Sequence, residues 1–308
     1  MEILFISSGN TKSGISPIIK NQGQSLINLG HKVTFYTIKG KGLKGYFNNI
    51  FTLRRFLKNK NFDVIHAHYS LSAMVASLSG AQPLVASLMG SDVKASGLLK
   101  YMIRFFNRLF WKKVIVKSED MKISAGLKES YIIPNGVDFE KFTPKDRNKS
   151  IEITQWDSSK KHILFAANPG RYEKNFVLAK QAFELLNDPS LELQVLIDIP
   201  NEKMVHYFNS ADVILLTSLW EGSPNVIKEA MACNCKIVAV DVGDVKKVIS
   251  NTQGCFVTSF NVKEIASTIK GALLLEYKTK GRNHIQYLNS SHIAQQIINI
   301  YNEILYSK

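Results

Sequence analysis

Short apolar or β-branched runs alternate with helical patterns along the chain, and this alternation restricts the fold more than any other feature. The first half has predicted strands at 3–6, 33–37, 64–66, 84–87 and 114–116, with helices at 15–29, 49–59, 70–79 and 98–111. The second half has predicted strands at 163–166, 193–197, 213–217, 237–240 and 255–257, with helices at 176–186, 203–209, 224–233 and 244–249. Because strands separated by helices pair in parallel through right-handed crossovers, we expect an α/β protein with two parallel sheets.

The two halves meet where Pro134, Asn135 and Gly136 interrupt the pattern. A chain of 308 residues is long enough for two ordinary domains, so we place them at 1–136 and 137–290. One further helical pattern follows at 291–305, with apolar residues at helical spacing.

Positive charge is concentrated in the first half. The net charge is +14, and residues 1–137 hold 19 Lys and Arg against 6 Asp and Glu, whereas the rest of the chain holds 20 against 19. A basic domain favours an anionic partner, which is a membrane surface, a nucleic acid or a phosphorylated acceptor. No nucleic-acid-binding motif accompanies the charge, so we expect no nucleic acid partner.

No apolar run is long enough and uninterrupted enough to predict a membrane span, and the N-terminus lacks a basic leader. We therefore expect a cytoplasmic protein. Cys233, Cys235 and Cys255 have neither metal-binding spacing nor the numbers for a disulfide framework, and buried packing is their expected role.

Glu221 and Glu229 lie eight residues apart around the predicted start of a helix. The expected cap is Ser223, with Pro224, Asn225 and Val226 as the first helical residues. A helix N-terminus attracts phosphate, and each carboxylate can accept hydroxyl groups, which together suit a nucleotide sugar. The simpler alternative is a capped helix with two solvated acids.

The stretch 219–240 resembles the Glu-x7-Glu segment of family 4 retaining glycosyltransferases. That resemblance implies the GT-B fold, in which two Rossmann-like domains have parallel sheets facing a central cleft. Segment 133–138 resembles the interdomain linker of this family, in which the C-terminal helix, here 291–308, crosses back onto the first domain. The resemblance covers nearly the full length and is strongest at 211–245.

The resemblance assigns donor binding to the second domain, with Glu229 on the ribose hydroxyls and Glu221 on the transferred sugar. Backbone amides from Gly222 to Val226 would approach the sugar and diphosphate. Lys174 and Arg171 follow a predicted strand, where cations can neutralise a diphosphate, although exposed surface cations are the alternative. Asn168 stands where the family usually has an Arg.

The chain has no Asp-x-Asp pair of the kind that holds a divalent cation in glycosyltransferases of the other major fold. We therefore expect a metal-independent enzyme with no cofactor, in which a helix end and cations hold the diphosphate.

The first domain is expected to bind the acceptor. Gly14 follows a strand in a position that resembles the family's glycine loop, which faces the donor phosphates across the cleft, although a plain turn is the alternative. The resemblance therefore places Gly14 among the donor-binding residues. His66 and His68 should point to one side of their strand, and His68 is the better candidate for the cleft, whereas a packed core histidine is the alternative. Asp92 lies in a turn that resembles the family's His-Gly-x-Asp, with Met89 in the histidine's place.

The resemblance implies that the enzyme has no protein nucleophile. The candidate catalytic residues are Glu221, Lys174, His68 and Asp92.

Segment 98–113 combines an aromatic and aliphatic face with a basic stripe. The predicted membrane contacts are Lys100, Arg104, Arg108 and Lys112. Interfacial helices bind anionic lipid through this combination, although an ordinary helix packed on its sheet would show the same apolar periodicity. Segment 39–60 is also basic and aromatic, which favours reversible contact with a membrane.

The predicted function is transfer of a sugar, with retention of configuration, from a nucleotide-diphosphate donor to a lipid-linked or cell-surface polysaccharide acceptor at the inner face of the membrane. The alternatives are a non-catalytic GT-B subunit that partners an active transferase, and a GT-B nucleotide-sugar epimerase.

Overall fold

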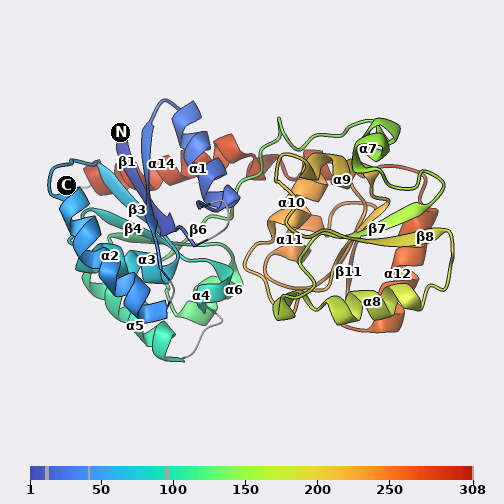
Figure 1. The fold of residues 1–308 in the computed structure, drawn as a ribbon, viewed down its shortest axis with the longest axis horizontal. Helices are drawn as coiled ribbons and strands as arrows, with labels where there is room; N and C mark the ends of the chain where they lie inside the picture. The colour runs from blue at the N-terminus through green and yellow to red at the C-terminus, as the bar shows by residue number, and fades with distance from the viewer. Residues whose placement is uncertain (11–13, 41, 94–96, 307–308) are drawn as a thin grey trace. The chain divides into compact units, whose positions relative to one another are not determined.

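The computed structural model describes residues 1–10, 14–40, 42–93 and 97–306 (Figure 1). The chain divides into two compact units. Unit 1 comprises Met1–Gly136 and Ser290–Lys308, and unit 2 comprises Val137–Asn289. The last helix, α14 (Ser290–Tyr306), packs against α1 (Pro17–Asn28) within unit 1.

Unit 1 is built on a six-stranded parallel sheet with strand order β2-β1-β3-β4-β5-β6. Its strands are β1 (Glu2–Ser8), β2 (Lys32–Ile38), β3 (Val64–His68), β4 (Leu84–Ser87), β5 (Lys113–Val116) and β6 (Tyr131–Ile132). The central strands read as continuous apolar runs because helices cover both faces of the sheet.

Helices α1 and α14 cover one face of this sheet, and α2, α3 and α5 cover the other (Figure 1). These three helices are α2 (Gly42–Leu57), α3 (Ser70–Leu78) and α5 (Gly97–Leu109). Two shorter helices of the same unit are α4 (Gly90–Val93) and α6 (Glu119–Ala125). The main apolar core of unit 1 lies between the sheet and this second layer, where Leu53, Ile103 and Trp111 pack on Ile65 and Ala86.

Unit 2 contains a five-stranded parallel sheet with strand order β11-β10-β9-β7-β8. Its strands are β7 (Lys161–Phe165), β8 (Leu191–Val195), β9 (Val213–Leu216), β10 (Ile237–Val240) and β11 (Cys255–Thr258). Its helices are α7 (Arg147–Thr154), η1 (Tyr172–Lys174), α8 (Phe176–Glu184), α9 (Met204–Ser210), α10 (Asn225–Ala232), α11 (Val245–Ile249), α12 (Val262–Leu274), α13 (Gly281–His284) and η2 (Gln286–Leu288). Helices α8 and α12 pack together on one face of the sheet, and α9 and α10 lie on the other (Figure 1).

The two parallel sheets confirm the predicted α/β fold with two Rossmann-like domains. All ten predicted strands form, and the two-residue β6 is an additional strand that is too short to show a period of its own. Helices α6, α7 and α12 were also missed. The caps that begin them are nevertheless visible in the sequence, because Ser118, Asp146 and Asn261 each accept a bond from a backbone N–H in the first turn.

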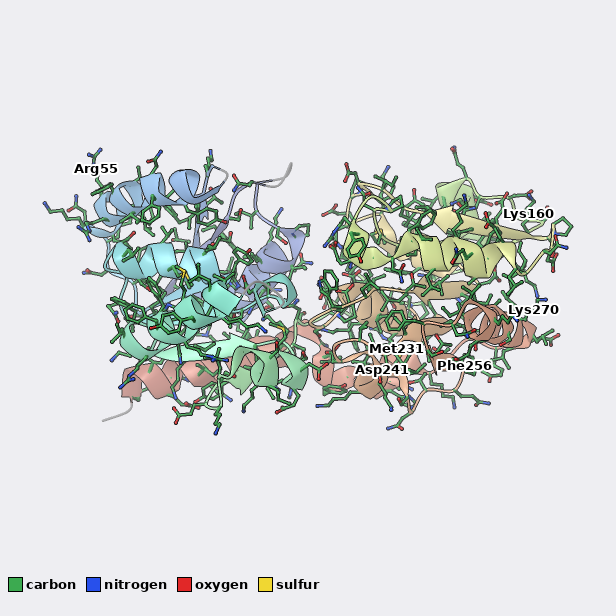
Figure 2. The ribbon with its side chains drawn as sticks, turned by 90° about the horizontal axis from the view of Figure 1, so that it is seen from below. Arg55, Lys160, Met231, Asp241, Phe256 and Lys270 are labelled. Carbon is green, nitrogen blue, oxygen red and sulfur yellow. The ribbon has the colours of Figure 1, made fainter. Side chains whose placement is uncertain are left out.

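The described part of the chain contains no helix that is long and apolar enough to cross a membrane. All three cysteines are free and buried, which confirms their expected packing role. Figure 2 shows how the side chains are distributed, with Arg55, Lys160 and Lys270 projecting outward from their elements.

Candidate functional site

Three loops of unit 2 are joined where β7, β9 and β10 end, which is the edge at which parallel sheets bind ligands. Thr217, directly after β9, donates through its hydroxyl to the carbonyl oxygens of Lys174 and Asn175, at 3.1 and 3.0 Å. The amide of Leu219 donates to the carbonyl of Glu173 at 2.8 Å. These bonds hold the loop that precedes α10 against the loop that follows β7.

Lys174 and Glu221 meet in this region as an ion pair. Lys174 Nζ lies 2.5 Å from Glu221 Oε1, and the side chains are only 14% and 15% exposed. Ser218 donates to the same carboxylate oxygen at 2.8 Å. The structure therefore brings together, in a partly buried ion pair, a cation and an acid that the sequence placed 47 positions apart.

Helix α10 begins one residue later than expected, and the predicted Ser223 cap is wrong. Pro224 occupies the cap position in an extended conformation, with no side chain capping the helix. Ser223 instead donates to Asp244 Oδ2 at 2.5 Å, because the loop after β10 brings that half-buried residue beside it. An N-terminus without a side-chain cap is a favourable place for an anion.

Gly243 allows the third loop to approach this region closely. It has φ +60°, and a Cβ built on it would lie 2.7 Å from the carbonyl oxygen of Gly222 and 2.9 Å from that of Glu221. Only glycine combines this conformation with this spacing. The turn after β10 therefore packs directly against the Glu221–Gly222 backbone.

Glu229 lies within α10 and remains partly accessible to solvent. Burial by the surrounding protein raises the pKa of Glu229 to about 7, while the nearby Lys141 cation and a hydrogen bond from Asn201 act in the opposite direction. Lys141 Nζ in turn donates to Asn201 Oδ1 at 2.5 Å. Lys228 is fully buried beside it, and burial lowers its pKa to about 8 against the attraction of Asp244 and Glu229.

Arg171 and Asn168 are engaged within their own loop. Arg171 Nε donates to Glu173 Oε1 at 2.7 Å, and the side chain is largely exposed. Asn168 Oδ1 accepts from the amide of Gly170 at 2.8 Å. Lys174 is thus held at Glu221, whereas Arg171 is held at Glu173, and a phosphate contact from Arg171 stays a prediction.

The candidate residues of unit 1 lie at or beyond the ends of its strands. Gly14 has φ +77° and open space around the position of a Cβ, whereas Lys12 and Ser13 of the same loop lie outside the described residues. His66 and His68 point to the same side of β3, as predicted, with ring centroids 4.4 Å apart.

His66 is a hydrogen-bonded core residue. It contacts the Tyr301 hydroxyl at 2.5 Å and the Ser87 hydroxyl at 2.7 Å, and burial lowers its pKa to about 3. His68 is also fully buried, and neither ring nitrogen has a partner among the described residues. Burial, with the neighbouring His66 and Lys117, holds the pKa of His68 well below its usual value, so the ring is neutral.

Asp92 joins two loops of unit 1. Its carboxylate accepts from the amide and hydroxyl of Ser70, at 3.2 and 2.9 Å, and from the amide of Met89 at 2.8 Å. Burial raises its pKa to about 7, against these three bonds. The bonds fix the start of α3 and the turn at Met89, so Asp92 has a structural task whether or not it contacts an acceptor.

The predicted interfacial segment forms α5, and its apolar residues divide into two sets. Met102, Phe106 and Phe110 pack on the core, whereas Leu98, Phe105 and Leu109 are exposed. The basic residues divide as well. Lys100 Nζ donates to Ser124 Oγ at 3.2 Å, and Arg104 Nε donates to the Ala125 carbonyl at 2.8 Å. The side chains of Arg108 and Lys112 make no hydrogen bond or ion pair with the residues that the structure describes.

The sequence did not single out Ser218, Lys228, Asn201, Lys141 or Asp244. A buried lysine inside α10 has no sequence signal, because Lys228 reads as an ordinary polar residue of an amphipathic helix. No three His, Cys, Asp or Glu side chains of the described residues come together as a candidate metal site. Metal independence stays a prediction.

Two family models match different halves of the chain. The model described as Glycosyltransferase Family 4 matches residues 13–141, and the model described as glycosyl transferases group 1 matches residues 190–287. A Bacillus subtilis protein named as a candidate teichuronic acid glycosyltransferase, TuaC, is 26% identical over 235 residues, which cover 67% of this chain and 60% of that protein.

An Escherichia coli protein, named UDP-Gal:α-D-GlcNAc-diphosphoundecaprenol α-1,3-galactosyltransferase, is 25% identical over 265 residues, covering 69% of this chain and 66% of that protein. The chain thus spans less than two thirds of the length of these two relatives.

Among solved structures, that of Anabaena Alr3699/HepE in complex with UDP has a TM-score of 0.75 at 16% identity, covering 98% of this chain and all of that one. This likeness concerns the fold, and it agrees with the two parallel α/β sheets. The sequence matches in both halves assign this chain to the family 4 glycosyltransferases.

Proposed function

We propose that this protein is a glycosyltransferase that takes a sugar from a nucleotide-diphosphate donor and retains its anomeric configuration. The donor would bind to unit 2 at the Lys174–Glu221 pair and the N-terminus of α10. The observation that carries the proposal is this pair, held at the ends of β7 and β9 beside an uncapped helix N-terminus.

The geometry supports distinct tasks for the donor-site residues. The α10 N-terminus and Lys174 can offset the charge that develops on the diphosphate as the bond to the sugar breaks. Glu221 can accept hydroxyls of the sugar, and Ser218 fixes its orientation. Glu229 can accept the ribose hydroxyls, and Asn201 and Lys141 stabilise its ionised form.

The acceptor is proposed to bind to unit 1, near His68 and Asp92, and Gly14 is proposed to face the donor phosphates. The name of the Escherichia coli relative mentions a UDP-sugar donor and an acceptor linked to diphosphoundecaprenol, and the Anabaena structure is a complex with UDP. UDP sugars and lipid-linked or cell-surface polysaccharide precursors are therefore the first substrates to test. The basic, partly apolar α5 supports peripheral attachment at the inner face of the membrane. We expect no metal and no nucleic acid partner.

A non-catalytic subunit is the second candidate. The side chains of Arg171 and Asn168 favour it, because they bond to residues of their own loop. Lys174 is then the cation held at Glu221. A nucleotide-sugar epimerase would use a similar donor site and would need no acceptor. The intact Lys174–Glu221 pair and the basic face of unit 1 favour transfer.

Thermal shift with UDP, GDP, ADP and the matching nucleotide sugars, with and without magnesium, tests the donor site first, since a ligand of the folded state raises the melting temperature. We expect one base to stabilise the protein without magnesium, Lys174→Ala and Glu229→Ala to lose that shift, and Lys180→Ala, a change on the exposed face of α8, to keep it. No shift with any nucleotide would leave the non-catalytic subunit. Conversion of the nucleotide sugar into its epimer without acceptor would identify an epimerase.

A further inference from the structure

A basic cavity of about 750 Å³ lies in unit 1, outside every residue assigned above to the donor or acceptor. Its walls come from the second half of α5, the start of β5 and the turn that leads from α6 to β6. Five cationic side chains line it, namely Arg104, Arg108, Lys112, Lys113 and Lys128. One carboxylate, Glu129, also lines it.

Two of these cations are already engaged. Arg104 is held by the Ala125 carbonyl, and Lys113 is paired with Glu303 at 2.9 Å and bonded to the Tyr131 hydroxyl at 2.7 Å. The side chains of Arg108, Lys112 and Lys128 are exposed and make no hydrogen bond or ion pair with the described residues. The cavity therefore presents three positive charges without a partner against the single carboxylate of Glu129, and this excess favours an anionic ligand.

An exposed apolar strip runs along α5 beside these cations. Tyr101, Phe105 and Leu109 are 69%, 49% and 57% exposed, and Leu98 extends the strip at 71%. Each of the first three is followed three positions later by a cation, which gives the pairs Tyr101–Arg104, Phe105–Arg108 and Leu109–Lys112. Residues three apart are neighbours on a helix surface, so Tyr101 and Phe105 border the basic side of the cavity. Leu109 is the last residue of α5, one turn beyond Phe105, and Lys112 follows the end of the helix.

Helix α2, on the same face of the sheet as α5 (Figure 1), repeats this combination. Phe47 and Phe51 are largely exposed on it, and Arg55 points outward (Figure 2). An acidic protein partner would match the charges alone. A surface of anionic phospholipid matches both features, because its phosphates accept from cations while its acyl region receives apolar side chains.

The cavity is also placed apart from the edge at which unit 1 is expected to bind its acceptor. Lys113 and Tyr131 are the first residues of β5 and β6, whereas Gly14, His68 and Asp92 lie at or beyond the carboxyl ends of β1, β3 and β4. Ligands of parallel α/β sheets bind beyond those carboxyl ends. A group bound in the cavity would therefore leave the acceptor edge of the same sheet open.

We propose that this cavity is a binding site for the phosphate of an anionic phospholipid headgroup, held by Arg108, Lys112 and Lys128 while Tyr101, Phe105 and Leu109 enter the adjoining acyl region. This rests on the peripheral attachment in the proposed function and gives it a defined site. The site is an anchor and takes no part in sugar transfer.

The test is sedimentation of the full chain with vesicles of phosphatidylcholine alone, or of phosphatidylcholine with phosphatidylglycerol. The test variant is Arg108→Gln/Lys112→Gln/Lys128→Gln. The matched control is Lys149→Gln/Lys263→Gln/Lys270→Gln, which removes the same charge from exposed positions of unit 2, where Lys270 projects outward from α12 (Figure 2). A third variant, Phe105→Ser/Leu109→Ser, removes part of the strip and keeps every cation.

We expect wild type and control to bind the phosphatidylglycerol vesicles alike. The test variant should bind them more weakly by on the order of 100-fold, since each basic residue near an anionic surface contributes about fivefold. The strip variant should also lose binding, by at least about tenfold, because it lacks two apolar insertions. Equal losses in the test variant and the control would show that only net charge matters and would overturn the proposal.

Three further results would count against the proposal. Unchanged vesicle binding by the strip variant would show that Phe105 and Leu109 do not enter the acyl region, and would overturn that part of the proposal. Calorimetric binding of glycerol 3-phosphate at Arg108, Lys112 and Lys128 without any preference for phosphatidylglycerol vesicles would identify a soluble phosphate ligand. Loss of the nucleotide-induced thermal shift in the test variant would show that these three cations support the donor site or its fold, and would overturn the claim that the cavity is only an anchor. Conversely, if wild type binds vesicles in a headgroup-dependent way but shows no nucleotide-induced thermal shift, the proposed lipid site is supported and the proposed transferase function is rejected.

Discussion

Replacing Gly243 with Ala should destabilise unit 2 more than a glycine replacement at an uncrowded turn. Gly243 has φ +60°, and the added Cβ would lie 2.7 Å from the carbonyl oxygen of Gly222 and 2.9 Å from that of Glu221. A left-handed conformation costs an L-residue roughly 1–2 kcal/mol. Crowding against backbone adds about 1–3 kcal/mol, because neither carbonyl can rotate away as a side chain would. The expected loss in unfolding free energy is therefore roughly 2–5 kcal/mol.

Gly30→Ala separates the two contributions. Gly30 has a comparable φ of +84°, but nothing lies within 4 Å of its Cβ position. Its replacement should cost only the conformational part, roughly 1–2 kcal/mol. Because Gly30 is in unit 1 and Gly243 is in unit 2, each variant is compared with wild type in the unfolding transition of its own unit.

Urea unfolding followed by tryptophan fluorescence and far-ultraviolet circular dichroism measures both changes. Trp156 and Trp220 belong to unit 2 and Trp111 to unit 1, so fluorescence reports on each unit. Gly243→Ala should also weaken the nucleotide-induced thermal shift, since the Glu221–Gly222 backbone must move to admit the Cβ. Losses for Gly243→Ala and Gly30→Ala that agree within about 0.5 kcal/mol would refute the crowding explanation.

The remaining predictions use the same unfolding measurements. Gly271→Ala should stabilise unit 2 by about 0.5–1 kcal/mol, because Gly271 lies inside α12 and its Cβ would meet nothing within 4 Å; a destabilisation would contradict this. Tyr301→Phe should cost about 1–3 kcal/mol by leaving buried His66 Nδ1 without its partner, whereas Tyr306→Phe at the exposed end of the same helix should change little. Folding raises the pKa of Glu229 from 4.5 to about 7, so the folded state holds this proton more tightly and the unfolding free energy falls as pH rises through that interval. Glu229→Gln should therefore be less sensitive to pH between these values than wild type, and an identical pH profile would argue against the raised pKa.

Local patterns were sufficient for the architecture. The alternation of apolar runs and helical patterns predicted ten strands and their parallel arrangement. When one face of a strand or helix is buried, apolar residues recur along the sequence at the spacing of that element. The same local reading failed for β6, which has only two residues, and for the capped helices α6, α7 and α12.

The candidate donor site was predictable only in part. The spacing of Glu221 and Glu229 around a helix start is a local property, and so is the position of Lys174 after a strand. The capping of α10 was predicted wrongly, because the competing partner of Ser223 is Asp244, 21 residues away on another loop. Sequence spacing does not show which distant loop will lie beside Ser223 in the folded protein.

What the sequence determined by itself was therefore the class of fold, the basic character of the first half and the residue types at the donor loop. Tertiary structure decided the ionisation of Glu229, the burial of Lys228 and His68, and the cavity that joins Arg108, Lys112 and Lys128. The physical reason is that periodicity and capping arise from neighbours along the chain. Burial, pKa and the shape of a cavity arise instead from groups that are brought together only when the sheets and helices have packed.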